Sequence, residues 1–497
     1  MKSFDVVIIG GGLGGLSCGA ILSKEGLGVC VLEKHSVVGG CLQSFRREGR
    51  TLDTGMHYVG SLSEGQIMHQ YLKYFGVIDS LRLQKLDENG FDEFHFKDGT
   101  SYCHAMGYEN FIETLASQFP DERSGLKTLC KTIQDIGDLI SPEILLEGKL
   151  SADGIKYMSE SAYQEIRKHL RSEKLRNVLA GNCRLYGGEK SVTSLYEYGM
   201  VTHSNIQGAY AFVDGSQQLA DTLAEVIRSN GGEVCPNSEV LKIRLESNTV
   251  EYVETRDGER LQGKYIISSL HPVVTFSLLE NNTVYKKAFF TRINSLKNTH
   301  GIFSTYLLTK RGTLKYVNRN NYMFNTQDVW ATEGHYKGFN IPSVLMCMQP
   351  NHLSEHTEVV TLLAPMPLTY YQKWLHTKVE NRGEEYREFK AEFSEAVIDF
   401  VAEFYPNIRS HIDKVYTASP LTYRDYTATP LGTAYGIVKD YRNPIVTHIP
   451  AKTRISNLLL TGQNLNIHGC IGTTVSSAVT SSEILGVEYL SKKIGNA

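Results

Sequence analysis

Three glycines near the amino terminus have the spacing of a nucleotide-binding turn. Gly10, Gly12 and Gly15 form a G-x-G-x-x-G pattern that also contains Leu13 and Gly14. In such a pattern the first glycine permits a sharp turn, the second lets the backbone approach a pyrophosphate, and the third lets helix and strand pack closely. The helix that follows offers unpaired N–H groups and a partial positive charge to the same pyrophosphate. The pattern therefore predicts a dinucleotide site.

An acidic residue stands where the ribose of that dinucleotide is expected. Glu33 ends the apolar run 29–32, and Lys34 follows it. A carboxylate at this point accepts hydrogen bonds from ribose hydroxyls and argues against a 2′-phosphate. We therefore expect NAD or FAD rather than NADP, and we place Lys34 in the same site.

The surrounding elements have the order that this site needs. Residues 4–9 are apolar except for Asp5, which is typical of a buried parallel strand. Residues 16–24 have a helical pattern, Gly26 and Gly28 end it, and 29–32 is a second strand-like run. The segment is therefore predicted to be a strand, a glycine turn, a helix and a strand.

A second glycine pair and a later motif distinguish between the two dinucleotides. Gly39, Gly40 and Cys41 come soon after Glu33, and the segment DTGMHY covers residues 53–58. Here the chain resembles the phytoene desaturase superfamily of FAD enzymes. The run 39–60 is most similar to its retinol saturase and carotenoid isomerase branch. The resemblance implies that the glycine pair lines the FAD pyrophosphate and that residues 55–58 lie near the isoalloxazine ring. Cys41 stands where distant relatives commonly carry Arg, so no charged phosphate contact is expected there.

Two later segments match further FAD contacts of this family. A turn at 212–216, a helix at 217–230 and a strand at 233–243 resemble the family unit in which backbone near Val240 meets the adenine. Near the end, an apolar strand at 457–460 runs into Gly462 and Gln463. Gly472 and Thr473 then open a final helix, whose amino terminus can face the flavin N1–O2 edge. Gln463 replaces an acidic residue that is frequent in the family, which keeps a hydrogen bond but no charge.

These segments predict an α/β fold with an α+β second domain. A Rossmann-type FAD-binding domain is expected from residues 1–75, 205–275 and 445–497, and a substrate-binding and helical cap domain with a mixed sheet from 76–204 and 276–444. Helices are predicted at 110–118, 125–139, 162–179, 386–404 and 474–490, and strands at 301–309, 343–348 and 359–364.

The composition excludes other classes of protein. The net charge of −3 argues against a nucleic-acid partner. Nine scattered cysteines without a CxxC pair indicate reduced thiols in a cytoplasmic protein. His352 and His356 fit a solvated loop, so no metal is expected. No apolar run is long enough to span a membrane. Basic residues within 162–179, close to the apolar-rich stretch 144–158, are compatible with peripheral membrane contact.

His57 and Tyr58 are the candidate catalytic residues, because the resemblance places them near the flavin. Saturation of an alkene requires a hydride from reduced flavin and a proton, which an imidazolium or a phenol can donate. The resemblance implies an FAD-dependent oxidoreductase acting on a carbon–carbon double bond of a hydrophobic polyene or isoprenoid-like substrate. Tyr423, Tyr426 and Tyr435 precede the last FAD motif and are candidates for the wall of a substrate tunnel.

Several alternatives remain open on the sequence. The same site serves a carotenoid cis–trans isomerase or a desaturase, and an amine or amino-acid oxidase would need a polar pocket. A lipid-binding escort protein shares the fold without redox activity, but the intact glycine motifs argue against it. There is no second strand-G-x-G-x-x-G-helix unit. NAD(P)H is therefore expected at most as a transient electron donor.

Overall fold

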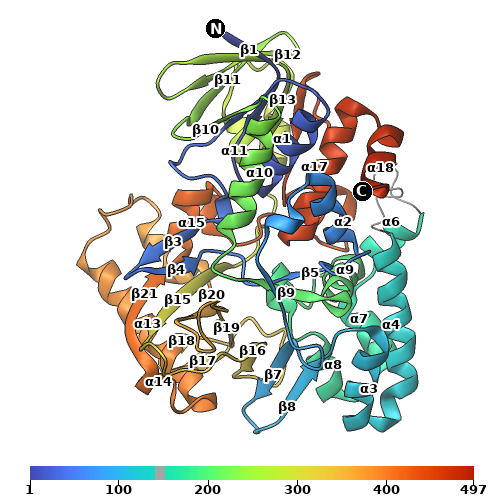
Figure 1. Cartoon of the computed structure of the whole chain (residues 1–497), viewed down its shortest axis with the longest axis vertical. Coiled ribbons are helices and arrows are strands. Elements are labelled where there is room, and N and C mark those ends of the chain that lie inside the picture. The colour runs from blue at the N-terminus through green and yellow to red at the C-terminus, as the bar shows by residue number, and fades with distance from the viewer. Residues whose placement is uncertain (140–151) are drawn as a thin grey trace.

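A mixed α/β structure with several sheets is seen in the computed structural model, which describes residues 1–139 and 152–497 (Figure 1). Residues 144–151 of the stretch considered for membrane contact lie outside the described residues. Figure 1 shows one large sheet at the top of the molecule, a second below it, and a group of helices at one side. None of the described helices combines the length and the apolar character needed to cross a membrane.

The first sheet has eight strands in the order β10-β2-β1-β13-β12-β11-β14, with β22 also paired to β13. Its parallel part comes from three distant parts of the chain, because β1 lies between β2 and β13, β10 adds to β2, and β22 adds to β13. The strands are β1 (Lys2–Ile9), β2 (Val29–Leu32), β10 (Glu233–Cys235), β11 (Val240–Glu246), β12 (Thr249–Thr255), β13 (Arg260–Ser268), β14 (Leu279–Glu280) and β22 (Leu458–Leu460).

Both faces of this sheet are covered, which explains the continuous apolar run in β1. Val6 and Ile8 belong to one buried cluster, whereas Val7 and Ile9 belong to another. Alternate side chains of a strand point to opposite faces, so an apolar residue is needed at every position. Against this sheet pack the helices α1 (Leu13–Lys24), α10 (Gln217–Ser229) and α17 (Gly469–Leu485) on one face, and α11 (Pro272–Ser277) and α12 (Lys287–Asn294) on the other.

The second sheet has seven strands in the order β21-β15-β20-β19-β16-β7-β8, and only the β16–β7 pair is parallel. Helix α13 (Glu384–Phe404) packs against it through Phe393, Val397 and Phe400. The strands are β7 (Asp92–Phe96), β8 (Ser101–His104), β15 (Gly301–Thr309), β16 (Asn320–Phe324), β19 (Ser343–Met348), β20 (Val359–Met366) and β21 (Ile412–Ala418).

The remaining strands and α-helices lie outside the two large sheets. The small strands are β3 (Ser44–Arg47) with β4 (Arg50–Asp53), β5 (Val59–Gly60) with β9 (Ala209–Phe212) and β6 (Leu83–Lys85), and β17 (His335–Tyr336) with β18 (Phe339–Asn340). The remaining helices are α2 (Ile67–Phe75), α3 (Tyr108–Gln118), α4 (Arg123–Asp138), α6 (Ala152–Met158), α7 (Ala162–His169), α8 (Glu173–Leu179), α9 (Leu195–Gln207), α14 (Ile408–His411), α15 (Pro420–Thr427), α16 (Pro444–Thr447) and α18 (Val487–Gly495).

Three of the predicted elements are each divided in two. The helix expected at 162–179 is α7 and α8. Ser172 caps α8 by accepting the Leu175 N–H at 3.2 Å, and the Glu122 carboxylate accepts the backbone N–H groups of Arg171 and Ser172 between the two helices. The last helix ends at Gly486, whose φ of 91° is left-handed, and α18 follows. The strand expected at 233–243 is interrupted by Pro236, so Val240 begins β11. All nine cysteines are free, in agreement with the prediction of reduced thiols.

Asp53, in the DTG segment, joins β4 to the start of α10. Its Oδ1 atom accepts hydrogen bonds from Ser44 Oγ at 2.6 Å and from the backbone N–H of Ser216 at 2.8 Å. Thr54, next in the chain, donates its hydroxyl to the Gln43 carbonyl at 2.8 Å. These bonds hold the loop that carries His57 against the rest of the protein.

We predict that Asp53→Ala lowers the free energy of unfolding by about 1–3 kcal/mol, because it leaves a buried N–H group without an acceptor. Chemical denaturation of the purified protein measures this effect. Asp79→Ala, at an exposed carboxylate, is the matched control and should leave the midpoint unchanged. Equal stability of the two variants would show that these hydrogen bonds do not hold the loop.

Candidate functional site

One cavity of about 420 Å³ collects most of the predicted site residues. This volume lies in the range of small-molecule and cofactor sites, about 300–1,000 Å³. The predicted residues in its lining are Gly10, Gly12, Leu13, Gly14, Glu33, Lys34, Gly39, Gly40, Cys41, His57, Tyr58, Val240, Gly462, Gln463 and Thr473. Gly15 and Gly472 are not part of the lining.

The glycines of the first turn have different roles. A Cβ atom at Gly15 would lie 2.0 Å from the Gly10 carbonyl oxygen, so this glycine permits close packing of helix on strand. Gly472 is similar, since its Cβ would lie 2.3 Å from the Ile467 carbonyl oxygen. A Cβ at Gly12 would meet no atom within 4 Å. Gly12 therefore leaves space inside the cavity that a ligand can fill.

Three glycine segments far apart in the sequence meet at this turn. The backbone N–H of Gly39 donates to the Gly11 carbonyl at 2.7 Å. A Cβ at Gly40 would lie 3.3 Å from Gly12 Cα, and a Cβ at Gly14 would lie 3.0 Å from Gly462 Cα. The segments therefore approach each other too closely for side chains at these glycines. This part of the cavity is built largely of main-chain atoms.

Glu33 and Lys34 are already oriented by protein groups. The two carboxylate oxygens of Glu33 accept the N–H groups of Gly11 at 2.8 Å and of His35 at 2.9 Å. The Lys34 ammonium donates to the Asp425 carbonyl at 2.6 Å, and burial lowers its pKa. Both side chains are thus fixed at the wall of the cavity. Burial raises the pKa of the Cys41 thiol to about 11, which agrees with an uncharged contact there.

His57 lies in the cavity as a neutral imidazole. Burial lowers its pKa to about 4, so it carries no charge at neutral pH. This differs from the imidazolium considered on the sequence, because the apolar surroundings oppose the charged form. Among the described residues, no group hydrogen-bonds to its buried Nε2 atom. That nitrogen is free to bond to a ligand.

Tyr58 belongs to a buried polar group that includes Asp92. The Tyr58 hydroxyl donates to Asp92 Oδ2 at 3.0 Å and lies 2.7 Å from the Tyr322 hydroxyl. Asn320 donates to the other carboxylate oxygen of Asp92 at 2.9 Å. Burial is the main cause that raises the pKa of Asp92 to about 7. Asp92 is therefore a proton donor and acceptor poised near neutral pH, in contact with a residue of the cavity wall.

Sequence reasoning missed Asp92 for a structural reason. It begins an ordinary strand, β7, and no motif surrounds it. The parallel pairing of β7 with β16 places Asp92 opposite Asn320 and Phe94 opposite Tyr322. The only signal in the sequence was a carboxylate at the start of an alternating apolar strand.

The second sheet supplies an apolar wall. Ile302, Leu345 and Leu363 from β15, β19 and β20 line the cavity. The three tyrosines predicted for a substrate tunnel, Tyr423, Tyr426 and Tyr435, line it as well. Their part in binding a substrate stays a prediction.

A buried lysine holds the last glycine segment and was also missed. The Lys439 ammonium donates to the carbonyls of Thr447, Asn464 and Leu465 at 3.0, 2.8 and 2.9 Å. Burial lowers its pKa to about 7. Lys439 therefore fixes the chain directly after Gly462 and Gln463. In the sequence, the only sign of this role was a lysine that follows apolar residues. Such a lysine is more often exposed than buried.

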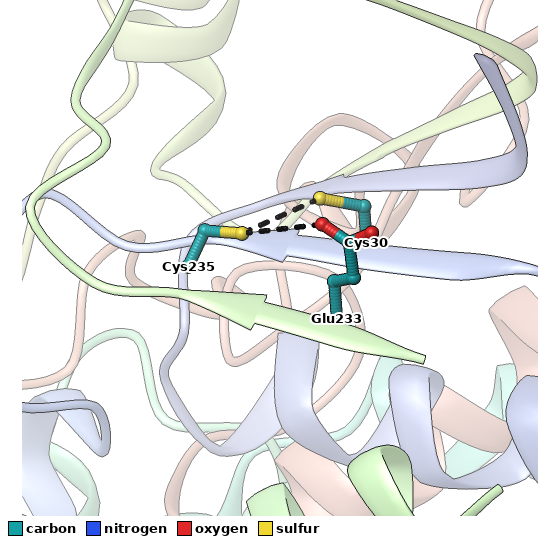
Figure 2. A group of neighbouring side chains, drawn as sticks. All are labelled: Cys30, Glu233 and Cys235. Carbon is teal, nitrogen blue, oxygen red and sulfur yellow. Dashed lines mark hydrogen bonds between the residues drawn. The ribbon is translucent and has the colours of Figure 1, made fainter. Parts of the chain in front are cut away.

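A group of potential metal ligands lies outside this cavity. Figure 2 shows Cys30 on β2 beside Glu233 and Cys235 on β10. Cys30 is opposite Glu233 in the parallel pairing, so the three side chains share one face of the sheet. The two sulfur atoms are 3.9 Å apart, and Cys235 donates to Glu233 at 3.9 Å. The expectation of no metal stays a prediction.

The family model for flavin containing amine oxidoreductase matches residues 13–485. This chain belongs to the flavin containing amine oxidoreductase family.

Individual relatives of the chain agree with the resemblance seen in the motifs. The chain is 26% identical to the all-trans-retinol 13,14-reductase of Rattus norvegicus over 97% of this chain and 86% of that protein. It is 24% identical to the phytoene desaturase (neurosporene-forming) of Cereibacter sphaeroides over 87% of this chain and 84% of that protein. An oxidoreductase of Methanosarcina mazei has a similar fold, with a TM-score of 0.65, 17% identity, and coverage of 96% of this chain and 99% of that one.

Family membership implies a flavin cofactor, and the cavity fits FAD. The space beside Gly12, the main-chain surface of the glycine segments and the fixed Glu33 carboxylate suit a dinucleotide. The free Nε2 atom of His57 offers a further hydrogen bond within the same cavity.

A matched pair of glycine substitutions tests this assignment. We predict that Gly12→Ala keeps the stability of the flavin-free protein but raises the FAD dissociation constant about tenfold or more, because the methyl group fills ligand space. Gly15→Ala should instead lower the free energy of unfolding by about 1–3 kcal/mol through overpacking. Flavin titration and chemical denaturation separate the two effects. The assignment is wrong if both variants bind FAD like the wild type.

Proposed function

We propose that this protein is an FAD-dependent oxidoreductase that acts on a carbon–carbon double bond of a hydrophobic polyene or isoprenoid-like substrate. The observation that carries this proposal is a single cavity that joins a glycine-lined cofactor region to an apolar wall with Tyr58 and Asp92 beside it. Relatives named as a retinol reductase and a phytoene desaturase support the choice of substrate class.

The cofactor would be held by a Rossmann-type domain assembled from residues 1–75, 205–275 and 445–497. The origin of the parallel strands of the first sheet supports this division. In the proposal, the main chain around Gly12 and Gly40 binds the pyrophosphate, Glu33 binds a ribose, and Val240 lies against the adenine. Thr473 and the amino terminus of α17 would face the flavin. The remaining segments, 76–204 and 276–444, would bind the substrate.

When bound in its reduced form, FAD would supply the hydride for saturation of the double bond. The protein's task is to exclude water and to supply a proton to the neighbouring carbon. Tyr58 is the proposed donor, because it lines the cavity and is hydrogen-bonded to Asp92. Burial holds the pKa of its phenol well above the usual value, so Tyr58 needs Asp92 to replace the proton as it is given up. A protonated Asp92 passes its proton to the phenol oxygen, across the hydrogen bond of 3.0 Å, in the same step in which Tyr58 gives its own proton to the substrate carbon. His57 is neutral and is proposed to position the ligand by a hydrogen bond from Nε2.

The proposal also includes an electron donor and a membrane surface. NAD(P)H would act as a transient electron donor. Peripheral membrane contact would deliver a lipid-soluble substrate, and the exposed Arg167 and Arg171 suit anionic headgroups. No nucleic acid is proposed.

The reaction is tested by an anaerobic single turnover. FAD-loaded protein is reduced chemically and mixed with all-trans-retinol, and the flavin spectrum and product mass are followed together. We expect reoxidation of the flavin and a product heavier by two hydrogens. A flavin that stays reduced while the double-bond geometry changes would identify an isomerase instead. Unchanged flavin and unchanged retinol would contradict retinoid saturation.

The proton path is tested by its pH dependence. Because Asp92 donates only when protonated, the single-turnover rate should fall as pH rises above about 7 in the wild type. Asp92→Asn should remove this dependence. Tyr58→Phe should slow turnover by about 100-fold or more, as for loss of a general acid.

Tyr71→Phe is the matched control. It also removes a buried hydroxyl, one without a hydrogen-bond partner among the described residues and outside the cavity lining. Its rate and pH profile should match those of the wild type. A wild-type rate in Tyr58→Phe would exclude Tyr58 as the donor.

A further inference from the structure

A second, small pocket adjoins the apolar end of the cavity. Its volume is about 30 Å³, and it shares Leu185, Ile302, Leu345, Leu363 and Tyr435 with the lining of the larger cavity. A buried water needs about 10–15 Å³, so the small pocket has room for about two water-sized groups.

The small pocket contains a buried arginine that has no acidic partner among the described residues. Arg184 is 9% exposed, and its Nη2 atom donates to the carbonyls of Val329, at 3.3 Å, and Ala331. Its buried Nε–H has no hydrogen-bond partner among the described residues. No carboxylate of the described residues lies at ion-pair distance from the Arg184 guanidinium. The charge of Asp328 is near enough to raise the pKa of Cys183, the residue before Arg184. However, Asp328 is already ion-paired with the Lys190 ammonium at 2.8 Å.

His300 lines the same pocket and also has an unused nitrogen. No described group hydrogen-bonds to its buried Nε2 atom. Burial, followed by the charges of Arg184 and Lys297, lowers its pKa to about 3, so the ring is neutral. A buried cation and an unpaired buried nitrogen are both unfavourable unless a partner is supplied. An anionic ligand would satisfy Arg184 and accept a hydrogen bond from His300.

We propose that this pocket binds the carboxylate end of an amphipathic substrate whose apolar chain lies along Leu345 and Leu363 in the larger cavity. This inference rests on the proposed function, because it assigns the substrate's polar end. Room for two water-sized groups matches the two oxygens of a carboxylate, and a guanidinium binds carboxylates with planar, charge-assisted hydrogen bonds. Arg184 and His300 thus become specificity residues, and substrates with an uncharged end bind more weakly.

Equilibrium binding to the full-length, FAD-loaded protein in its oxidised form tests the proposal without turnover. The probes are all-trans-retinoic acid, its methyl ester and all-trans-retinol, followed by calorimetry and by perturbation of the flavin spectrum. We expect the acid to bind about tenfold or more tightly than the ester, as for a charge-assisted pair. Arg184→Gln should abolish this preference while leaving FAD content unchanged. Arg167→Gln, at an exposed arginine of α7, should keep it.

Equal binding of acid and ester to the wild type would overturn the proposal, and this comparison needs no folded variant. Wild-type acid preference in Arg184→Gln would overturn the role of Arg184. The proposed function fails separately. Acid preference without turnover of any polyene keeps the pocket and contradicts the reaction, whereas turnover of retinol without acid preference contradicts only the pocket.

Discussion

Direct contact between main-chain segments is the constraint on which the cavity depends. A Cβ atom on Gly40 would lie 3.3 Å from Gly12 Cα, and one on Gly14 would lie 3.0 Å from Gly462 Cα. These residues come from both ends of the chain, so the turn forms only when β1 and β22 are both in the first sheet. The contacts that stabilise the sheet therefore also determine the shape of the cofactor region. Lys439 contributes to both, because its three hydrogen bonds fix the chain beyond Gly462.

Burial then determines the charge of each group around the cavity. It removes the positive charge of His57, brings the pKa of Asp92 up to about 7 and brings that of Lys439 down to about 7. Each shift favours the neutral form, as a low-dielectric surrounding requires. Arg184 differs from these groups, because it is a buried guanidinium whose Nε–H has no partner among the described residues. It is therefore the group near the cavity with most to gain from an anionic partner.

Much of the fold was readable from local patterns. The apolar run of β1, the glycine turn and the periodicity of α13 each depend on neighbours close in the chain, and they were predicted. The break between α7 and α8 was not predicted, although Ser172, which caps α8, is a local signal for it. The Glu122 carboxylate that binds N–H groups at the break is 49 residues away from Arg171 in the chain. The neutral state of His57 could not be read from the sequence either, because the buried surroundings that lower its pKa are assembled from distant segments.

By itself, the sequence determined that the chain carries a dinucleotide-binding glycine turn and resembles FAD enzymes, because such turns demand glycine at set spacings. Only the tertiary structure decided which side chains share the cavity with that turn. The pairing of β7 with β16 brought Asp92 to Tyr58, and the second sheet brought Leu345 and Leu363 beside Arg184. These contacts join residues that have no local relation. They arise from strand register and sheet packing, and a linear pattern contains neither.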